Sequence, residues 1–173
     1  MTDKPVVNGP VVNRPVVNIA DIPLTENRHG DRFLARLGRI GAAIGLTGLG
    51  CTLHVVPPGK RAFPFHAHHV ADELFFIVSG EGQYRFGAET FAVRPGDVLG
   101  APAGKTAHQL VNTGAEDLRY LAFSTKGSFD VVEYPDSKKF AVAAGVRNGD
   151  FRTASFAHIA AAGDSLDYWN GEP

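Results

Sequence analysis

The sequence has 173 residues, of which 44% are hydrophobic and 20% are charged, and its formal net charge is −1 at pH 7. These proportions are typical of a folded globular domain and exclude a largely disordered chain. The balanced charge argues against nucleic acid as a partner. A single cysteine excludes an intrachain disulfide and a zinc site of several thiolates; we interpret Cys51 as a buried, unreactive thiol.

No segment has the pattern of a membrane span or of a secretory signal. Residues 40–58 carry no Asp, Glu, Lys or Arg, but they include four glycines and end in Pro57-Pro58. That composition does not fit a transmembrane helix. The start of the chain lacks the compact apolar run of a signal peptide. We therefore expect a cytoplasmic protein with no membrane partner.

The first 18 residues contain the repeat Pro-Val-Val-Asn three times, at a period of five residues. Each proline lacks a backbone donor, so no central strand can run through this segment. We interpret residues 1–24 as an N-terminal arm, with an arm exchanged between subunits as the alternative.

Residues 25–50 contain arginines at near-helical spacing, namely Arg28, Arg32, Arg36 and Arg39. Five glycines between positions 38 and 50 disfavour a stable helix there. We predict extended structure and turns, with the arginines on a solvated face.

Short runs of Val, Phe, Tyr, Ile and Leu alternate with glycine and proline after residue 50, a pattern typical of an all-β protein. Ser79–Gly82 predicts a hairpin, and Arg94–Asp97 has the Pro-Gly centre of a type II turn. Strands are predicted at 51–56, 61–68, 73–78, 82–87, 90–94, 97–101, 106–112 and 118–124. We expect residues 25–125 to form an antiparallel barrel or jelly roll.

Residues 126–173 predict a loop-rich C-terminal tail with one short helix near 153–162. The tail contains Trp169, the only tryptophan. We expect it to anchor the tail on the barrel; the alternative is that Tyr168 or Trp169 covers a ligand pocket or contacts a second subunit.

The residues that carry chemistry are His66, His68, Glu73 and His108. On a strand, two residues separated by one position point to the same side, so the two imidazoles of His66 and His68 can converge on one ion. Glu73 opens the next predicted strand. His108 lies on a distant strand, and in a closed barrel distant strands face one another.

The same alternation of faces predicts the surroundings of the site. Phe75 and Ile77 share the inner face with Glu73, and Leu110 and Asn112 share it with His108. We expect Phe75, Ile77 and Leu110 to line a mainly apolar substrate pocket. Tyr84 or Tyr120 could supply a hydroxyl. The remaining histidines are interpreted as structural, exposed or solvated: His29, His54, His69 and His158.

Two segments resemble the motifs of the cupin family. Gly59–Gly80 resembles the first motif, with His66-Ala67-His68 and Glu73 inside it, and Gly96–Asn112 resembles the second, with Pro102-Ala103-Gly104 and His108. Each departs from the usual spacing by one extra residue before a histidine. The chain is similar to single-domain bacterial cupins without a settled activity. The resemblance implies a cupin-type β-barrel of six to eight strands, a central metal and commonly a homodimer.

Three imidazoles and one carboxylate suit one divalent transition metal per chain, with Fe, Mn, Zn, Ni and Cu all open. We expect a small-molecule enzyme of the dioxygenase, isomerase or decarboxylase type, with Glu73 as a candidate catalytic base. The alternative is a non-catalytic cupin that binds a small ligand or sugar, or acts as a sensor. A storage or structural barrel without metal is a third interpretation.

Overall fold

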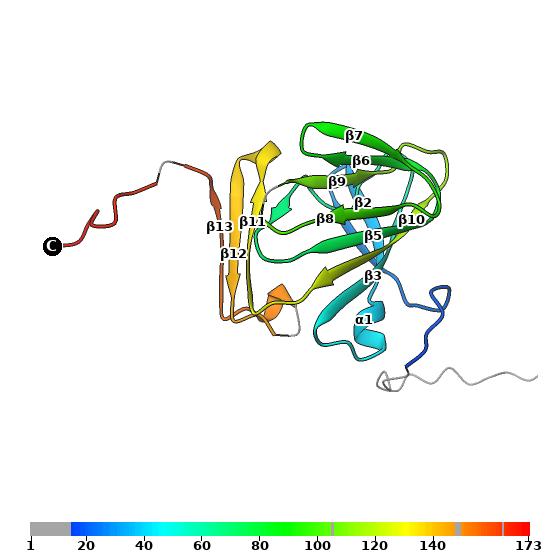
Figure 1. The fold of residues 1–173 in the computed structure, drawn as a ribbon, viewed down its shortest axis with the longest axis horizontal. Coiled ribbons are helices and arrows are strands. Elements are labelled where there is room, and N and C mark those ends of the chain that lie inside the picture. Colours follow the sequence, from blue (N-terminus) through cyan, green and yellow to red (C-terminus); the bar gives the residue numbers. More distant parts are fainter. Residues whose placement is uncertain (1–14, 105, 148–149, 164) are drawn as a thin grey trace, which may run out of the picture.

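The computed structural model describes residues 15–104, 106–147, 150–163 and 165–173. Its regular structure is almost entirely antiparallel β-sheet, with a single α-helix in this part of the chain, α1 (Ile40–Ala43) (Figure 1). The strands form a jelly-roll barrel with a smaller sheet beside it. This confirms the all-β, antiparallel fold class. No helix in the described ranges is long and apolar enough to cross a membrane.

Two sheets form the barrel. The larger has the spatial order β1-β2-β3-β10-β5-β8, and the smaller has the order β7-β6-β9. The bounds of the larger sheet are β1 (Thr25–His29), β2 (Phe33–Gly38), β3 (Leu49–Val56), β10 (Leu118–Thr125), β5 (Glu73–Ser79) and β8 (Val98–Ala101). Those of the smaller sheet are β7 (Glu89–Val93), β6 (Gly82–Phe86) and β9 (His108–Val111).

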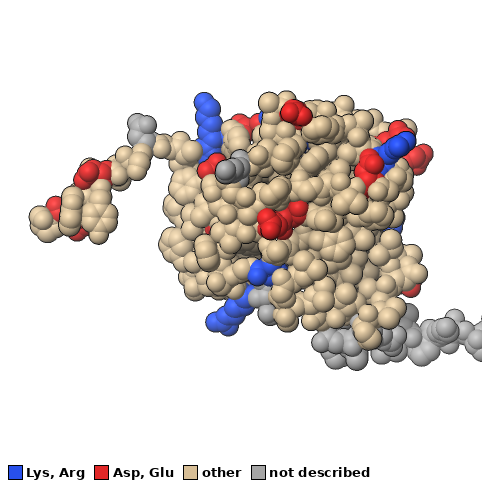
Figure 2. All heavy atoms as spheres, in the orientation of Figure 1, with Lys and Arg blue, Asp and Glu red and all other residues tan. Residues whose placement is uncertain are grey.

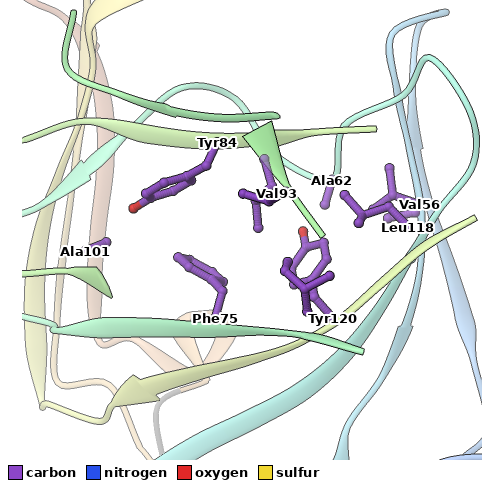
Figure 3. Close-up of a cluster of buried hydrophobic side chains, with 11 residues drawn as sticks. Val56, Ala62, Phe75, Tyr84, Val93, Ala101, Leu118 and Tyr120 are labelled. Carbon is purple, nitrogen blue, oxygen red and sulfur yellow. The ribbon is translucent and has the colours of Figure 1, made fainter. Parts of the chain in front are cut away.

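The hydrophobic core lies between these sheets and contains side chains from both (Figure 3). The rings of Phe75 and Tyr120 from the larger sheet lie 6.0 Å apart, and Tyr84 of the smaller sheet lies 6.2 Å from Phe75. Ile77 is fully buried in the same cluster. Because each such side chain contributes about 1.5–3 kcal/mol when buried, this cluster holds the two sheets together.

Two glycines permit the tight turns that align the barrel strands. Gly80 has a φ of +81°, and a Cβ there would lie 2.5 Å from the carbonyl oxygen of Asp117. Gly96 has a φ of +94°, as the third position of a type II turn requires, and Asp97 donates its backbone N–H to Arg94. The predicted turn at Arg94–Asp97 is confirmed. Ser79–Gly82 is also a turn, but it connects β5 and β6, which lie in different sheets, so the predicted hairpin is wrong.

The C-terminal region differs from the prediction, because it contributes three strands. β11 (Phe129–Tyr134), β12 (Lys139–Ala144) and β13 (Phe156–Ala161) form a sheet with β4 (Ala67–His68), in the order β13-β12-β11-β4. Short 3₁₀ turns occur at Pro135–Ser137 and Phe151–Thr153. The predicted helix near 153–162 is wrong: its alanines favour a helix locally, but pairing with β12 over the full length of β13 overrides that preference.

Other predicted elements need smaller corrections. The strand expected at 61–68 is regular only at 67–68, since Pro64 cannot donate to a ladder, although Arg61 and His66 form isolated bridges. The segment 25–50 forms two strands and the short helix α1. Trp169 is 69% exposed, so its predicted role as an anchor on the barrel is wrong. Cys51 is buried, as expected.

The N-terminal repeat falls mainly on residues 1–14, which lie outside the described residues. In the part that follows, Ile22 is buried. Val17 and Ile19 pack against the same hydrophobic cluster, together with Leu53 and Val55 of β3. This segment is therefore attached to the outer side of the larger sheet.

Candidate metal centre

Three histidines and one glutamate converge where the C-terminal sheet meets the barrel. His66 and His108 form a backbone bridge, in which each residue donates its N–H to the other's carbonyl oxygen. His68 lies on β4, and Glu73 begins β5. The Nε2 atoms of His66, His68 and His108 lie 3.8, 3.6 and 2.9 Å from Oε2 of Glu73. His66, His68 and Glu73 each offer a ligand atom, and these atoms lie within 4.8 Å of one another.

Hydrogen bonds outside the cluster fix two of the imidazoles. Nδ1 of His66 lies 2.8 Å from the carbonyl oxygen of Pro64, which can only accept a hydrogen bond. Nδ1 of His68 lies 2.6 Å from a carboxylate oxygen of Asp130. A proton on Nδ1 in both rings leaves the Nε2 lone pairs directed at the centre of the cluster, the arrangement in which histidine binds a metal.

Several buried polar atoms of the cluster lack a hydrogen-bond partner within the described part of the chain, namely Oε2 of Glu73 and both ring nitrogens of His108. The 2.9 Å approach of His108 to Glu73 therefore lacks the geometry of a hydrogen bond. Unpaired buried acceptors are costly, whereas a cation among them would satisfy them. The residues present thus fit a divalent metal ion.

The surroundings shift the pKa values of the titratable groups in the cluster in different directions. Burial lowers the pKa of His66 to about 4, an effect to which the neighbouring His108 adds. Burial also opposes the charging of His68, but Asp130 and Glu73 outweigh it and raise its pKa. For Glu73, burial raises the pKa, yet the three nearby imidazoles reverse the shift and lower it. The carboxylate of Glu73 is therefore ionised at neutral pH.

A small cavity of about 140 Å³ lies behind the cluster, inside the barrel. All three residues expected at the substrate pocket belong to the core cluster; Phe75 and Leu110 also line this cavity, whereas Ile77 does not. His54 and Tyr120 line it as well, with His54 Nδ1 and the Tyr120 hydroxyl 2.9 Å apart. His54, interpreted above as structural or exposed, is buried, and the alternation of faces along β3 is the signal that indicates its inward position.

A larger cavity of about 810 Å³ opens on the other side of His68 and Glu73, between α1, β3 and the C-terminal sheet. Three cationic side chains line it, Arg39, Lys126 and Arg147, and we call it the basic cavity. Within the described ranges, none of the three forms a salt bridge, whereas four other arginines do. The segment expected to carry only solvated arginines thus places Arg39 at this cavity.

A third cavity, of about 430 Å³, extends from His66, His68 and Glu73 over the C-terminal sheet. Its lining is mainly apolar and includes Val132, Ala141, Ala143, Ala157 and Ile159. We call it the apolar groove. The candidate metal centre is therefore accessible from a basic side and from an apolar side.

The three remaining histidines are exposed and are not part of the cluster. His29 is exposed, and His69 points outward, where its Nε2 lies 3.0 Å from Glu133. His158 is exposed on β13. These placements agree with the roles predicted for them.

Residues 52–124 match the Cupin_2 family model, described as a cupin domain. This part of the barrel is a cupin-type domain. The match contains all four side chains of the candidate metal centre. The strands β11 to β13, of which β11 supplies Asp130, lie outside the matched residues.

Two curated relatives share this cupin domain. The chain is 33% identical over 67 residues to the oxalate-binding protein of Thermotoga maritima, and 33% identical over 70 residues to an uncharacterized protein of Methanocaldococcus jannaschii. These alignments cover 39% and 40% of the chain. The chain spans 54% of the length of each relative.

A solved structure extends the similarity to the C-terminal region. The crystal structure of a proposed sugar phosphate isomerase from Acidithiobacillus ferrooxidans superposes with a TM-score of 0.74 at 26% sequence identity. The similarity covers 86% of this chain and 91% of that protein. The similarity to that structure thus includes both the barrel and the sheet beside it.

The pair His68–Asp130 supplies a testable prediction. We expect Asp130→Asn to weaken metal binding by about 10- to 100-fold, because an amide N–H₂ facing Nδ1 moves the imidazole proton to Nε2 and removes the ligand lone pair. The matched control is Glu133→Gln, which alters the exposed pair with His69. Competition with a fluorescent chelator measures both affinities. Equal affinities in the two variants would contradict the role of Asp130.

Proposed function

We propose that this cupin binds one divalent transition metal through His66, His68, Glu73 and His108, and that it isomerises a small phosphorylated sugar. The observation that carries the proposal is the buried convergence of these four side chains, with acceptor atoms on Glu73 and His108 that lack hydrogen-bond partners among the described residues. A metal ion at this position would supply Lewis-acid polarisation of substrate oxygens.

The basic cavity supports a phosphorylated substrate. Arg39, Lys126 and Arg147 can surround a phosphate group, while His68 and Glu73 of the same cavity face the rest of the molecule. The lining also contains three acidic residues. Asp130 is engaged with His68 and Asp150 with Arg152, and the third, Glu73, belongs to the candidate metal centre. The similarity to a proposed sugar phosphate isomerase over most of both chains favours isomerisation over dioxygenation and decarboxylation.

Aldose–ketose isomerisation moves a proton from the hydroxyl-bearing carbon to the carbonyl carbon, and a second proton from the hydroxyl oxygen to the carbonyl oxygen. The first transfer requires a base that faces the substrate. Glu73 is our candidate, because it is ionised at neutral pH and lines all three cavities beside the cluster. In this role Glu73 would both hold the metal ion and present a carboxylate oxygen to the substrate. The neutral His54–Tyr120 pair borders the same space and can orient substrate hydroxyls.

The proposal is tested with protein loaded anaerobically with Fe, Mn, Ni, Cu or Zn and incubated with matched sugar phosphates and unphosphorylated sugars. We expect aldose–ketose conversion of phosphorylated substrates only. Arg147→Ala should raise KM for these substrates about tenfold with little change in kcat, because it removes a charged contact to the phosphate. Arg28→Ala is the control, since Arg28 pairs with Glu26 outside the basic cavity. Absence of turnover with every metal and sugar would contradict the proposal.

A second candidate is a cupin that binds a small anion without converting it. The similarity to an oxalate-binding protein favours this function, because an open metal site and a basic cavity can together hold a dicarboxylate. Calorimetry with metal-loaded protein distinguishes the two functions. Tight oxalate binding without turnover of oxalate or of any sugar phosphate would favour the binding protein.

A further inference from the structure

The apolar groove has a floor of small side chains that leads from the candidate metal centre to the edge of the C-terminal sheet. Pairing of the strands places His68, Val132, Ala141 and Ile159 in one row across the sheet. The next row on the same face contains Asp130, Ala143 and Ala157. Alanines at these positions leave space above the sheet that larger side chains could occupy.

The outer part of this floor is exposed. Ile159 is 67% exposed, although it extends the row of the buried Val132. β13 is the edge strand, and five of its six residues are exposed. An apolar edge strand with free backbone groups is a site for pairing with another chain.

The segment that follows β13 carries a second set of exposed apolar side chains. Residues 165–173 stand away from the body of the molecule (Figures 1 and 2). Leu166, Tyr168 and Trp169 are 75%, 84% and 69% exposed. The two aromatic rings pack edge to face against each other, 4.8 Å apart. Such a cluster of large apolar side chains on the surface is typical of an interaction site.

We propose that residues 165–173 of one chain cover the apolar groove of a second copy of this chain, so that Tyr168 and Trp169 close the apolar side of the partner's metal centre. The large aromatic side chains complement the alanine floor. The segment also carries Asp167 and Glu172, which complement Lys139, whose ammonium lies 5.1 Å from the centre of the Tyr134 ring in the adjacent row.

In an edge-to-edge dimer, residues 165–173 of one chain can reach the apolar groove of the other chain. In an antiparallel pair of β13 strands related by a two-fold axis, the end of one strand lies beside the start of the other, near Phe151 and Ala157 of the groove. From Ala161 to Trp169, an extended chain reaches about 26 Å. That length exceeds the roughly 14 Å between the first and last strands of a four-stranded sheet. The inference concerns assembly and does not depend on the reaction.

Trp169 is the only tryptophan, so its fluorescence reports its own environment. With the full chain, light scattering should show a dimer, and dilution should dissociate it with a red shift of the Trp169 emission. Ile159→Lys should weaken dimerisation at least tenfold and red-shift the emission at a fixed concentration. Phe91→Ala is the control, because Phe91 is exposed on β7, away from the groove. Circular dichroism checks that each variant is folded.

A mixing experiment tests which surfaces meet. Ile159→Lys damages the groove, and the double variant Tyr168→Ala and Trp169→Ala damages the segment. A mixture of the two should recover part of the dimer, because one intact groove then meets one intact segment. A chain that is monomeric at every concentration, a dimer with Trp169 still exposed, a buried Trp169 that is insensitive to dilution, or a mixture without recovery would each overturn the proposal.

Discussion

Replacing either His66 or His108 by alanine is expected to reduce the metal content from about one transition-metal ion per chain to a small fraction of that value. Each substitution removes one of three imidazoles whose Nε2 atoms lie within 3.8 Å of Oε2 of Glu73. It also leaves Oε2 of Glu73 with fewer imidazole nitrogens beside it to hold a cation. Elemental analysis of protein purified without chelators and then dialysed measures the loss.

The control for this experiment is His158→Ala, which removes an exposed imidazole on β13 that lines the apolar groove but is not part of the cluster. We expect its metal content to equal that of the unaltered protein. A second readout is thermal stability: an ion present at 100 times its dissociation constant stabilises the folded state by about 2.7 kcal/mol. Equal metal content in all three variants would show that the assigned ligands do not hold the ion.

The free energy of unfolding of the metal-free protein is expected to fall as the pH decreases from 6.5 to 5. Burial lowers the pKa of His54 from 6.5 to about 4. Over this range the unfolded chain takes up a proton at His54 and the folded chain does not, so acid favours unfolding. One such group lowers the stability by about 1.4 kcal/mol per pH unit, or about 2 kcal/mol over the range. Urea unfolding at several pH values measures the slope.

The variant His54→Gln isolates this contribution. Glutamine can still form a hydrogen bond with the Tyr120 hydroxyl, but it does not titrate. The slope of the free energy of unfolding against pH should therefore decrease by the amount that corresponds to about one bound proton. His66 has a pKa that is lowered in the same direction, and its share of the slope remains in the variant. An unchanged slope in His54→Gln would mean that His54 accepts a proton in the folded state.

The barrel was predictable because its sequence and its structure follow the same local rules. Gly80 and Gly96 mark turns with a positive φ, and β5, which ends before Gly80, alternates exposed and buried residues from Leu74 to Ile77. The same alternation predicts that His66 and His68 point to one side and that Phe75 shares the inner face of Glu73. Distances along the chain could not show that His108 pairs with His66, because that contact depends on closure of the barrel.

The C-terminal sheet was not predictable in this way. The alternation in Phe129–Tyr134 is a strand signal that the abundance of loop residues around it concealed. Residues 156–161 contain three alanines, which favour a helix when considered alone, and only the partner strand β12 decides otherwise. Asp130, the partner of His68, was missed for the same reason, since nothing in the sequence links positions 62 residues apart.

Asp130 belongs to β11, outside the residues that match the cupin domain, yet its carboxylate lies 2.6 Å from the ring of His68. A barrel excised at residue 125 would therefore keep every side chain of the cluster while losing the group that holds one of them in its tautomer. Transplanting the cupin motifs alone into another scaffold would encounter the same difficulty. The appended sheet and the candidate metal centre are thus coupled through this contact, so a shortened version of the chain has to retain both.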